Sequence, residues 1–445
     1  MRSPGTGSDQ GARPSRRGVR AVLAAGVAAT LLAGCGGGGG DAGGDAGGDG
    51  GQVVLDFAWW GDKTRAERYE KAVALFEGEN PGVDVRTRYA AFGDYWTARN
   101  TEAAGGALPD VLQMDVSYIT DYAENGRIAP LDEHLGSGID VSTLPASVLP
   151  ATKVGGETYG IPTSTNTLAT IVNTDLLAEL GVPVPGPDLT WQGYDEFLAA
   201  VTAAGAARTP TVHGSSDYTQ FISLFQVWLG QRGKAMFDDD GGLGFDEDDL
   251  AEWWGRSPQL HEAGAFLPPE RLAQLEGTDA IGSRESAAEI SWDNFLVRFS
   301  EGAGGAAMAL LPPPVDDPAE RGLFLKPSLM LSMSANTEHP AEAAALIDFI
   351  TNDPRVGEVF GMSRGVPASA RAREGLQPTG PDQQILEYEE ALAPQLTSAP
   401  PPPVAGFGAL EAAFTRIGED LSYGSVSVAE AVEQWFTEAE STLGG

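Results

Sequence analysis

One stretch of the 445-residue sequence decides its fold: Thr158-Tyr-Gly-Ile-Pro-Thr-Ser-Thr-Asn-Thr-Leu-Ala-Thr-Ile-Val-Asn-Thr-Asp-Leu-Leu177. It opens like a turn, because Pro162 lacks a backbone donor and holds the residue before it in an extended conformation. Residues 167–172 are β-branched and apolar, which predicts a short strand. A helix should begin directly afterwards, with Asn173 or Thr174 as its N-cap. A loop, a strand and a capped helix in this order favour a crossing of the chain between two lobes.

Strand-like and helical segments alternate ahead of this stretch. In order, they are a strand at 53–58, an amphipathic helix at 62–79, a strand at 83–89, a helix at 94–105 and a strand at 110–114. This alternation argues for a parallel sheet with helices on its faces. Because ligands of such sheets bind outside the carboxyl ends of the strands, the loops after the three strands should open at one edge. These loops contain residues 59–62, residues 92–96 and Asp115.

The later part of the chain is mostly helical by pattern. We predict helices at 191–207, 218–230, 246–254, 340–352, 354–362, 382–396, 407–421 and 428–443, a hairpin at 236–245 and a buried strand at 306–310. The chain should cross between the lobes again near 326–335 and near 365–367. Residues 400–403 are prolines and predict a rigid spacer.

The stretch quoted first resembles the Y-G-I-P … L-x-Y-N-x-D-L-L segment of bacterial extracellular solute-binding proteins, the sugar-capturing subunits of ATP-driven importers. Further stretches agree with this family in the same order: Leu108-Pro-Asp-Val-Leu-Gln-Met-Asp115, Gly126-Arg-Ile-Ala-Pro-Leu131, Leu189-Thr-Trp-Gln-Gly-Tyr194, Phe299-Ser-Glu-Gly-Ala-Gly-Gly-Ala-Ala-Met308 and Gly365-Val-Pro-Ala-Ser369. The resemblance covers residues 52–445, and its specificity lies in the ordered set rather than in any one motif. It departs from the family pattern at Val172, where Tyr is usual.

The resemblance implies an α/β fold of two lobes, the periplasmic-binding-protein fold of type II, in which each lobe is a sheet flanked by helices and hinge crossings join them. The N-terminal lobe would comprise residues 52–165 and 328–366, and the C-terminal lobe residues 166–327 and 367–445. The implied function is that of a binding subunit of an ABC transporter, which captures a neutral sugar or oligosaccharide by hinge closure and delivers it to the permease subunits. We expect a monomer without enzymatic activity.

The first 35 residues are typical of an export leader. A basic start is followed by an apolar run at 21–34 that is short for a membrane-spanning helix. The motif Leu32-Ala-Gly-Cys35 resembles the bacterial lipobox, which implies lipidation at Cys35 and anchoring at the extracellular face of the cytoplasmic membrane. An ordinary signal peptide and a twin-arginine signal at 15–19 are alternatives. Residues 36–51, nearly all Gly, Asp and Ala, predict a flexible tether that reaches on the order of 20 Å.

The implied sugar site needs aromatic platforms for the apolar ring faces and planar polar side chains for the hydroxyls. From these residue types and from the predicted loops and crossings, we expect the ligand to contact Trp59, Trp60, Asp94, Tyr95, Asp115, Asn166, Gln226, Trp228, Trp292, Asp293, Arg364 and Phe407. Ser164 lies at the same crossing as Asn166 and should line the cleft with it. Asp115 and Phe407 stand where the family carries a sugar carboxylate and an aromatic platform, although the platform is often Trp. Structural alternatives exist: the aromatic residues could pack in cores, Asp94 and Asp115 could cap helices, and Arg364 could join the lobes.

The chain is strongly acidic. It carries 63 acidic and 28 basic residues, a formal net charge of −35. Such a balance disfavours nucleic acid, anionic membrane surfaces and strongly anionic ligands as partners, so a neutral ligand fits best. Polyamines, glycerol phosphate and iron are alternative solutes for the same fold, although sparse basic residues argue against the phosphate.

Enzymatic and metal-dependent alternatives find little support in the sequence. The four histidines are far apart and lack the spacing of a zinc site. No Gly-x-Ser-x-Gly elbow stands in a convincing context for a secreted hydrolase. Residues 237–249 are acidic and glycine-rich but lack the alternating ligands of a helix-loop-helix calcium loop. We therefore expect no catalytic residues, no metal and no cofactor.

Overall fold

The computed structural model describes residues 52–238, 240–275 and 278–444. The predicted leader, Cys35 and the Gly/Asp tether lie outside these residues. In the part described, the strands form a six-stranded sheet, a three-stranded sheet and a two-stranded ribbon. The strands are β1 (Val53–Trp60), β2 (Val83–Ala90), β3 (Val111–Met114), β4 (Lys153–Val154), β5 (Glu157–Thr158), β6 (Ile161–Asn166), β7 (Leu168–Asn173), β8 (Ala288–Trp292), β9 (Met308–Leu311), β10 (Lys326–Met333) and β11 (Val366–Pro367).

Helices occupy most of the chain between these strands, as the pattern predicts. They are α1 (Lys63–Glu79), α2 (Phe92–Ala104), α3 (Val116–Glu124), α4 (Thr174–Leu180), α5 (Trp191–Gly205), α6 (Ile222–Gly230), α7 (Glu247–Trp254), α8 (Arg256–Glu262), α9 (Pro269–Leu272), α10 (Phe295–Gly302), α11 (Pro340–Asn352), α12 (Pro354–Phe360), α13 (Ala370–Arg373), α14 (Pro381–Leu392), α15 (Phe407–Ser422) and α16 (Val428–Leu443). None of the helices in the described residues is both long and apolar enough to span a bilayer.

The six-stranded sheet forms the first lobe, with the strand order β11-β6-β10-β3-β1-β2. β1 pairs in parallel with both β2 and β3, which confirms the arrangement predicted from the alternating strands and helices. β10 returns from the second lobe and runs antiparallel between β3 and β6. The sheet is therefore mixed, because a strand from much later in the sequence completes its centre.

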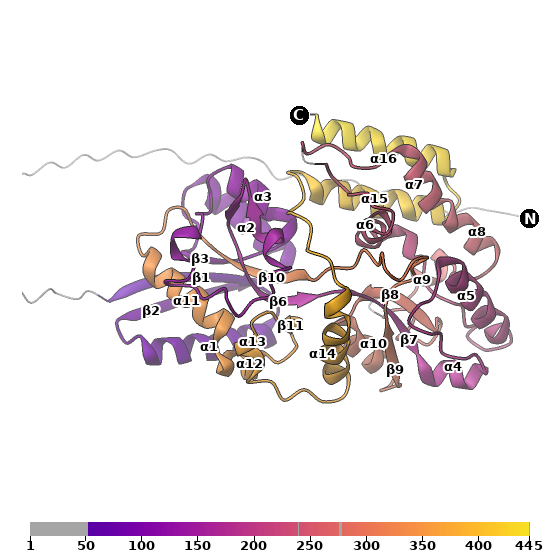
Figure 1. Cartoon of the computed structure of the whole chain (residues 1–445), viewed down its shortest axis with the longest axis horizontal. Helices are drawn as coiled ribbons and strands as arrows, with labels where there is room; N and C mark the ends of the chain where they lie inside the picture. Colours follow the sequence, from indigo (N-terminus) through magenta and orange to yellow (C-terminus); the bar gives the residue numbers. More distant parts are fainter. Residues whose placement is uncertain (1–51, 239, 276–277, 445) are drawn as a thin grey trace, which may run out of the picture. The chain divides into compact units, whose positions relative to one another are not determined.

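Helices cover both faces of this sheet (Figure 1). Successive strand residues point to opposite faces, so β1 contributes to two cores. Leu55, Phe57 and Trp59 pack against α1, α11 and α12. Ala58 and Trp60 pack against α2 and α3 on the other face. The carboxyl ends of β1, β2 and β3 therefore meet beside α2 and α3, which is the edge at which the sequence predicts the ligand loops.

The second lobe is built on the antiparallel sheet β8-β7-β9. Every residue of its central strand β7 is buried. The core around β7 extends into α5, α6, α7, α14, α15 and α16. The side chain of Asn173 accepts a hydrogen bond from the Leu176 backbone N–H at 2.9 Å, which confirms the predicted N-cap of α4.

In the described chain, three segments pass between the lobes. β6 continues into β7 through Thr167, β10 follows the coil after β9, and the coil after α13 leads to α14. The backbone oxygen of Arg364 accepts hydrogen bonds from the hydroxyl of Ser164, at 2.7 Å, and from that of Ser328. These bonds tie β6, β10 and the residues just before β11 together at one point.

Two of the predicted boundaries differ from the structure. Residues 161–166, expected to open with a turn, form the buried strand β6, which tolerates Pro162 because its pairing with β10 is irregular near this residue. β11 still pairs with β6, and α13 packs on α11 and α12. The chain therefore leaves the first lobe after α13, later than the expected boundary at residue 366, because the predicted crossing at Val366 is itself an edge strand of the first sheet.

The helix predicted at 218–230 is broken. A short 3₁₀ turn at Tyr218–Gln220 is followed by Phe221, whose φ of −96° and ψ of 99° are extended, and only then by α6. Asp217 caps the turn by accepting from the Thr219 backbone N–H at 2.9 Å. The periodicity of apolar residues continues through the break, so the pattern alone did not reveal it.

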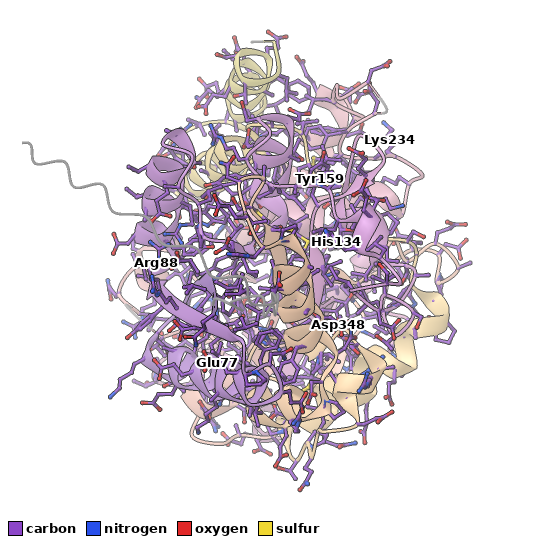
Figure 2. All side chains as sticks on the ribbon, turned by 90° about the vertical axis from the view of Figure 1, so that its left-hand side faces the viewer. Glu77, Arg88, His134, Tyr159, Lys234 and Asp348 are labelled. Atoms are coloured by element: carbon purple, nitrogen blue, oxygen red, sulfur yellow. The ribbon has the colours of Figure 1, made fainter. Side chains whose placement is uncertain are left out.

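Charged residues lie mainly on the outside of the described part. Figure 2 shows Glu77 and Arg88 on the outer side of the first lobe, and Arg88 pairs with Glu102 at 3.2 Å. Pairs of this exposed kind contribute about 0–1 kcal/mol each, because water and salt screen them. Stability therefore resides in the three apolar cores rather than in the surface charges.

Candidate functional site

A cavity of about 900 Å³ lies between elements of the two lobes. The first lobe contributes α3 and the segment 151–155 to its lining. The second lobe contributes α6, the turn at 234–241, the end of β8, the coil that leads into β10, the segment 397–407, and parts of α15 and α16. We call this cavity the cleft. Its walls come from segments that are more than 300 residues apart in the sequence, so only the folded chain assembles it.

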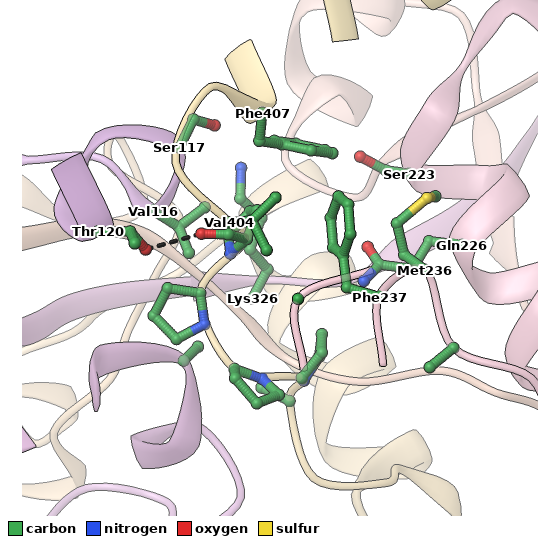
Figure 3. A pocket seen from close by; sticks show the side chains of 18 of the residues that line it. Val116, Ser117, Thr120, Ser223, Gln226, Met236, Phe237, Lys326, Val404 and Phe407 are labelled. Atoms are coloured by element: carbon green, nitrogen blue, oxygen red, sulfur yellow. Dashed lines mark hydrogen bonds between the residues drawn. The ribbon is translucent and has the colours of Figure 1, made fainter. Parts of the chain in front are cut away.

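Aromatic rings form much of the second-lobe side of the cleft. Trp292, Phe237, Phe324 and Phe407 all line it, and each is half-buried. The rings of Phe237 and Phe407 meet edge to face with centroids 5.8 Å apart, as Figure 3 shows. Phe221 packs edge to face on Trp292 at 5.8 Å and braces it from the side. These rings offer apolar surfaces on which a ligand ring can lie.

Several polar side chains also line the cleft and form no hydrogen bond with another described residue. Ser117 on α3 and Ser223 and Gln226 on α6 line the cleft (Figure 3), and among the described residues their side chains have no hydrogen-bond partner. Ser223 and Gln226 stand three residues apart on one face of α6. Because these groups are half-buried, a ligand that bonded them would replace few water contacts. They are donors and acceptors suited to hydroxyl groups.

The proline run borders the cleft rather than spacing two domains. Residues 397–405 pass along it as a coil, and the Thr120 hydroxyl on α3 donates a hydrogen bond to the Pro403 carbonyl at 2.7 Å (Figure 3). This bond joins the first lobe to a segment that leads into α15 of the second. Prolines hold such a segment extended without needing backbone donors.

The charges that line the cleft balance, although the chain as a whole is strongly negative. Of the described residues, the charged ones in the lining are Lys153, Lys234, Lys326, Glu124, Asp238 and Glu411, so three cations face three carboxylates. The local charge is therefore near neutral inside a chain of net charge −35. A cleft of this kind does not favour an ion of either sign over a neutral ligand.

Glu411 and Lys326 are the two charged lining residues that are half-buried. Burial raises the pKa of the Glu411 carboxyl above its usual range, Lys326 opposes this shift, and Asp115 adds to it. The ammonium nitrogen of Lys326 lies 5.0 Å from the ring centroid of Trp292. Lys326 begins β10 and pairs in the sheet with Asn166, so its backbone is fixed at a crossing between the lobes.

Three of the residues predicted from the sequence line the cleft: Gln226, Trp292 and Phe407. They come from α6, from the end of β8 and from the start of α15, and the fold brings them together although they are distant in the chain. Their assignment as ligand contacts stays a prediction until a ligand is bound. The cleft makes them accessible to one.

The candidates at the edge of the first sheet lie behind this cleft. Trp59 is in the core with Tyr69 at 4.5 Å, whereas Trp60 packs on Tyr95 on the other face at 5.4 Å. The Tyr95 hydroxyl donates to the Gln113 carbonyl at 2.7 Å. Asp94 is exposed on the first turn of α2, whose N-cap is Ala91. The four candidates do not line the cleft.

These aromatic residues nevertheless support one wall of the cleft. Trp60 contacts Trp96, and Trp96 stacks on Tyr118 of α3 with centroids 3.8 Å apart. Asp115 caps α3, accepting from the Ser117 backbone N–H at 2.9 Å. Asp115 is thus one residue away from the lining of the cleft, and it fills the capping role that was the structural alternative for it.

The candidates at the crossings form the connection between the lobes. Asn166 donates to the side chain of Asn294 at 3.2 Å, and Ser164 bonds the Arg364 carbonyl. The guanidinium of Arg364 is buried 3.7 Å from the ring centroid of Phe360, and this burial lowers its pKa. None of these side chains lines the cleft.

Asp293 and Trp228 are held in the second lobe. The carboxyl of Asp293 is fully buried and accepts from the backbone N–H of Thr167 at 3.1 Å and of Asn294 at 2.7 Å. Trp228 is buried under Arg232, whose guanidinium carbon is 3.6 Å from its ring centroid. Both are absent from the lining of the cleft. In each case a neighbour on the strand or helix, Trp292 or Gln226, takes the accessible position.

Several cleft residues were missed by the sequence reasoning. Glu411 follows Phe407 by four residues on the same helix, so it shares the helix face of a predicted candidate. Lys326 is the lone cation in the predicted crossing at 326–335. These two signals could have found them. Nothing in the sequence marks Phe237 and Phe324 as cleft residues, because aromatic side chains in turns and coils often pack in a core instead.

The acidic stretch at 237–249 uses its carboxylates for local structure. Asp238 accepts from the backbone N–H groups of Gly242 at 2.8 Å and Asp240 at 3.0 Å. Asp246 and Asp249 form the capping box of α7. Among the residues that the structure describes, no group of three or more His, Cys, Asp or Glu side chains is arranged to hold a metal ion.

Comparisons with known proteins agree with this architecture. A Brucella abortus (strain 2308) protein named as a binding protein is 22% identical over 340 residues, which are 76% of this chain and 78% of that one. An extracellular solute-binding protein of family 1 from Alicyclobacillus acidocaldarius is 28% identical, with a TM-score of 0.70 over 88% of this chain and 99% of that chain. An ABC substrate-binding protein of Listeria monocytogenes, solved with cycloalternan, is 19% identical with a TM-score of 0.73 over the same shares.

These likenesses confirm the predicted α/β two-lobed periplasmic-binding-protein fold. The family model described as bacterial extracellular solute-binding protein matches residues 71–384. This match also confirms the predicted class, a binding protein rather than an enzyme. The chain belongs to the family of bacterial extracellular solute-binding proteins.

Proposed function

We propose that this protein captures an uncharged oligosaccharide in the cleft and delivers it to the membrane subunits of an ABC importer. One observation carries the proposal: a cavity of about 900 Å³ between the lobes is walled by aromatic rings and by polar side chains that have no hydrogen-bond partner among the described residues, and its lining charges balance. The similar Listeria protein solved with cycloalternan supports a saccharide as the ligand class.

The dimensions and chemistry of the cleft suit a sugar of more than one unit. Binding sites for small molecules span roughly 300–1,000 Å³, and this cleft lies near the upper end of that range. Trp292 and the Phe237–Phe407 pair can receive apolar ring faces, while Ser223 and Gln226 can bond hydroxyls.

Capture would proceed by hinge closure. The packed cores would keep each lobe rigid, while a few residues at the crossings would change φ and ψ. A ligand that touches both lobes only when they are shut shifts the population to the closed form. The permease subunits would recognise that form.

Neutral oligosaccharides are expected to raise the melting temperature of the purified protein. A ligand that binds only the folded state stabilises it by about 2.7 kcal/mol at a hundredfold excess over Kd. Maltotriose, cellotriose and xylotriose represent the proposed class in a thermal-shift screen, and spermidine and glycerol 3-phosphate represent the alternative solutes. A shift with spermidine or glycerol 3-phosphate, and none with any saccharide, would overturn the proposal.

The site itself is tested by a pair of variants. Trp292→Ala should weaken binding of the stabilising saccharide about tenfold or more, since it removes a stacking surface and its buried area. Tyr423→Ala removes an exposed aromatic side chain just after α15, outside the lining of the cleft, and should leave the affinity unchanged. Equal losses in the two variants would mean that the saccharide binds elsewhere.

Anchoring through Cys35 is part of the proposal and has a separate test. Cys35→Ala is expected to move the protein from the membrane fraction of the producing cells to the soluble fraction, because acyl chains supply the membrane affinity. The wild-type chain, extracted into the detergent phase, is the control. A membrane-bound Cys35→Ala protein would contradict lipidation at this residue.

A further inference from the structure

Two of the charged side chains that line the cleft are free to meet a ligand inside it. Lys234 is held by Asp249, with 2.5 Å between the ammonium nitrogen and the carboxylate oxygen. Asp238 is used by the backbone of its own turn. Glu124 and Lys153 are exposed to water. The remaining charged residues of the lining are Lys326 and Glu411, and both are half-buried.

The charged groups of Lys326 and Glu411 are not neutralised by a neighbouring side chain in the described structure. Neither takes part in an ion pair or a side-chain hydrogen bond with any residue described, so their charged atoms are more than 4.0 Å from an opposite charge. They are nevertheless close enough for Lys326 to act on the ionisation of Glu411. Both residues line the cleft, where a ligand group can enter.

We infer that Lys326 and Glu411 together select uncharged sugars and reject charged ones, by holding hydroxyl groups of one ligand between an ammonium and a carboxylate. This inference rests on the proposed function and names the chemical class that the site accepts. A sugar hydroxyl can donate to Glu411 and accept from Lys326, so neighbouring hydroxyls satisfy both charges. A uronate carboxylate would be repelled by Glu411, and an amino sugar by Lys326.

Both side chains are held on regular structure, which a selective contact requires. Lys326 is the first residue of β10, and its ammonium rests near the face of Trp292 at 5.0 Å from the centroid. Glu411 lies on the second turn of α15, four residues after Phe407. A sugar ring placed on the aromatic wall would therefore present its edge to the two charges. Partial burial makes their electrostatic effect larger than it would be at an exposed surface.

Removing one charge should change the class of ligand, rather than only weaken binding. Glu411→Gln leaves Lys326 unopposed, so the variant should bind digalacturonic acid at least about tenfold more tightly than the wild type does, and the neutral ligand about tenfold more weakly. Lys326→Gln leaves Glu411 unopposed and should gain affinity for the glucosamine disaccharide instead. The double variant should lose both gains. Isothermal titration at neutral pH with these two probes and the best neutral trisaccharide measures all three.

Matched controls use exposed charges outside the lining of the cleft. Glu419→Gln on α15 and Lys71→Gln on α1 make the same chemical changes at exposed positions and should leave selectivity within about twofold, because water screens these charges. If the wild type binds a neutral saccharide and Glu411→Gln gains nothing for digalacturonic acid, or the control variants gain as much, the inference is wrong while the proposed function stands. If the wild type binds no neutral saccharide, the proposed function fails and the inference fails with it.

Discussion

Replacing Gly365 by alanine is expected to lower the free energy of unfolding by on the order of 3 kcal/mol. Gly365 has a φ of +99°, a conformation that L side chains rarely adopt. A Cβ atom there would lie 2.3 Å from the Asn166 amide oxygen and 2.5 Å from the Thr165 carbonyl oxygen. Because the carbonyl belongs to β6 and cannot move alone, the crossing itself would have to shift. Chemical denaturation of the two proteins measures the difference.

Gly424→Ala is the matched control for the crowding at this crossing. Gly424 follows α15 with a φ of +67°, and a Cβ there would meet no atom within 4 Å. The free energy of unfolding of this variant should fall only by the cost of placing alanine in the left-handed conformation, about 1 kcal/mol. If Gly365→Ala were no more destabilised than Gly424→Ala, the close packing of Gly365 against β6 would not contribute to stability.

Replacing Glu389 by glutamine is expected to make the protein less sensitive to alkaline pH. Glu389 on α14 is buried beside Asp293, and its carboxylate accepts from the Thr165 hydroxyl at 3.1 Å. The two carboxyls are within hydrogen-bonding reach of each other, and the Glu389 Oε1 atom has no partner among the described groups. Such a pair is best satisfied when one proton lies between the carboxyls.

The sign of the pH dependence follows from the burial of this pair. Burial raises the pKa of both carboxyls above their usual range, and their mutual repulsion raises that of Glu389 further, while the charge of Arg373 opposes the shift. The folded chain therefore binds more protons than the unfolded chain above about pH 4. The associated stability is fully present below that pH and is lost as the pH rises through the folded pKa values.

Glutamine at position 389 keeps the size of the side chain but cannot ionise, and its amide can donate to Asp293. We expect the variant to be more stable than the wild type by on the order of 2 kcal/mol at about pH 9, and no more stable at about pH 5. Glu289, whose buried carboxyl has its pKa raised to about 7, stays in both proteins, so a smaller pH dependence of the same sign should remain.

The measurement is the free energy of unfolding of both proteins across this pH range. Glu390→Gln provides the control, since Glu390 is the exposed neighbour of Glu389 on the same helix. It should follow the wild-type curve. Parallel curves for Glu389→Gln and the wild type would show that this pair does not hold a proton when folded.

Local sequence patterns predicted most of the elements of the first lobe. β1, α1, β2, α2 and β3 follow the predicted strands and helices within about two residues at their ends, because each has a clear period of apolar residues and a stop signal after it. The failures have physical causes. The pairing of β6 with β10 has register shifts next to Pro162, so a strand survives where a turn was expected. Val366 and Pro367 are too few to give any strand pattern, and tertiary pairing with β6 forms β11.

The sequence predicted the types of side chain that line the candidate site, but only some of the individual residues. Aromatic and planar polar groups do line the cleft, and three of them, Gln226, Trp292 and Phe407, were named from the sequence. The choice between adjacent side chains could not be made, since the sequence does not show that Trp292, at the end of β8, faces the cleft while Asp293, the next residue, is buried. The same holds for Gln226 and Trp228 on α6.

By itself, the sequence determined most of the local elements, the N-cap of α4 and the class of protein, because these depend on residues close together in the chain and on an ordered set of motifs. Only the tertiary structure decided which residues meet in the cleft. α3, α6, β10 and α15 supply its walls, and their side chains converge because long-range strand pairing and helix packing orient them. The balance of charge between Lys326 and Glu411 has the same origin, since 85 residues of chain separate two groups that the fold brings to one cavity.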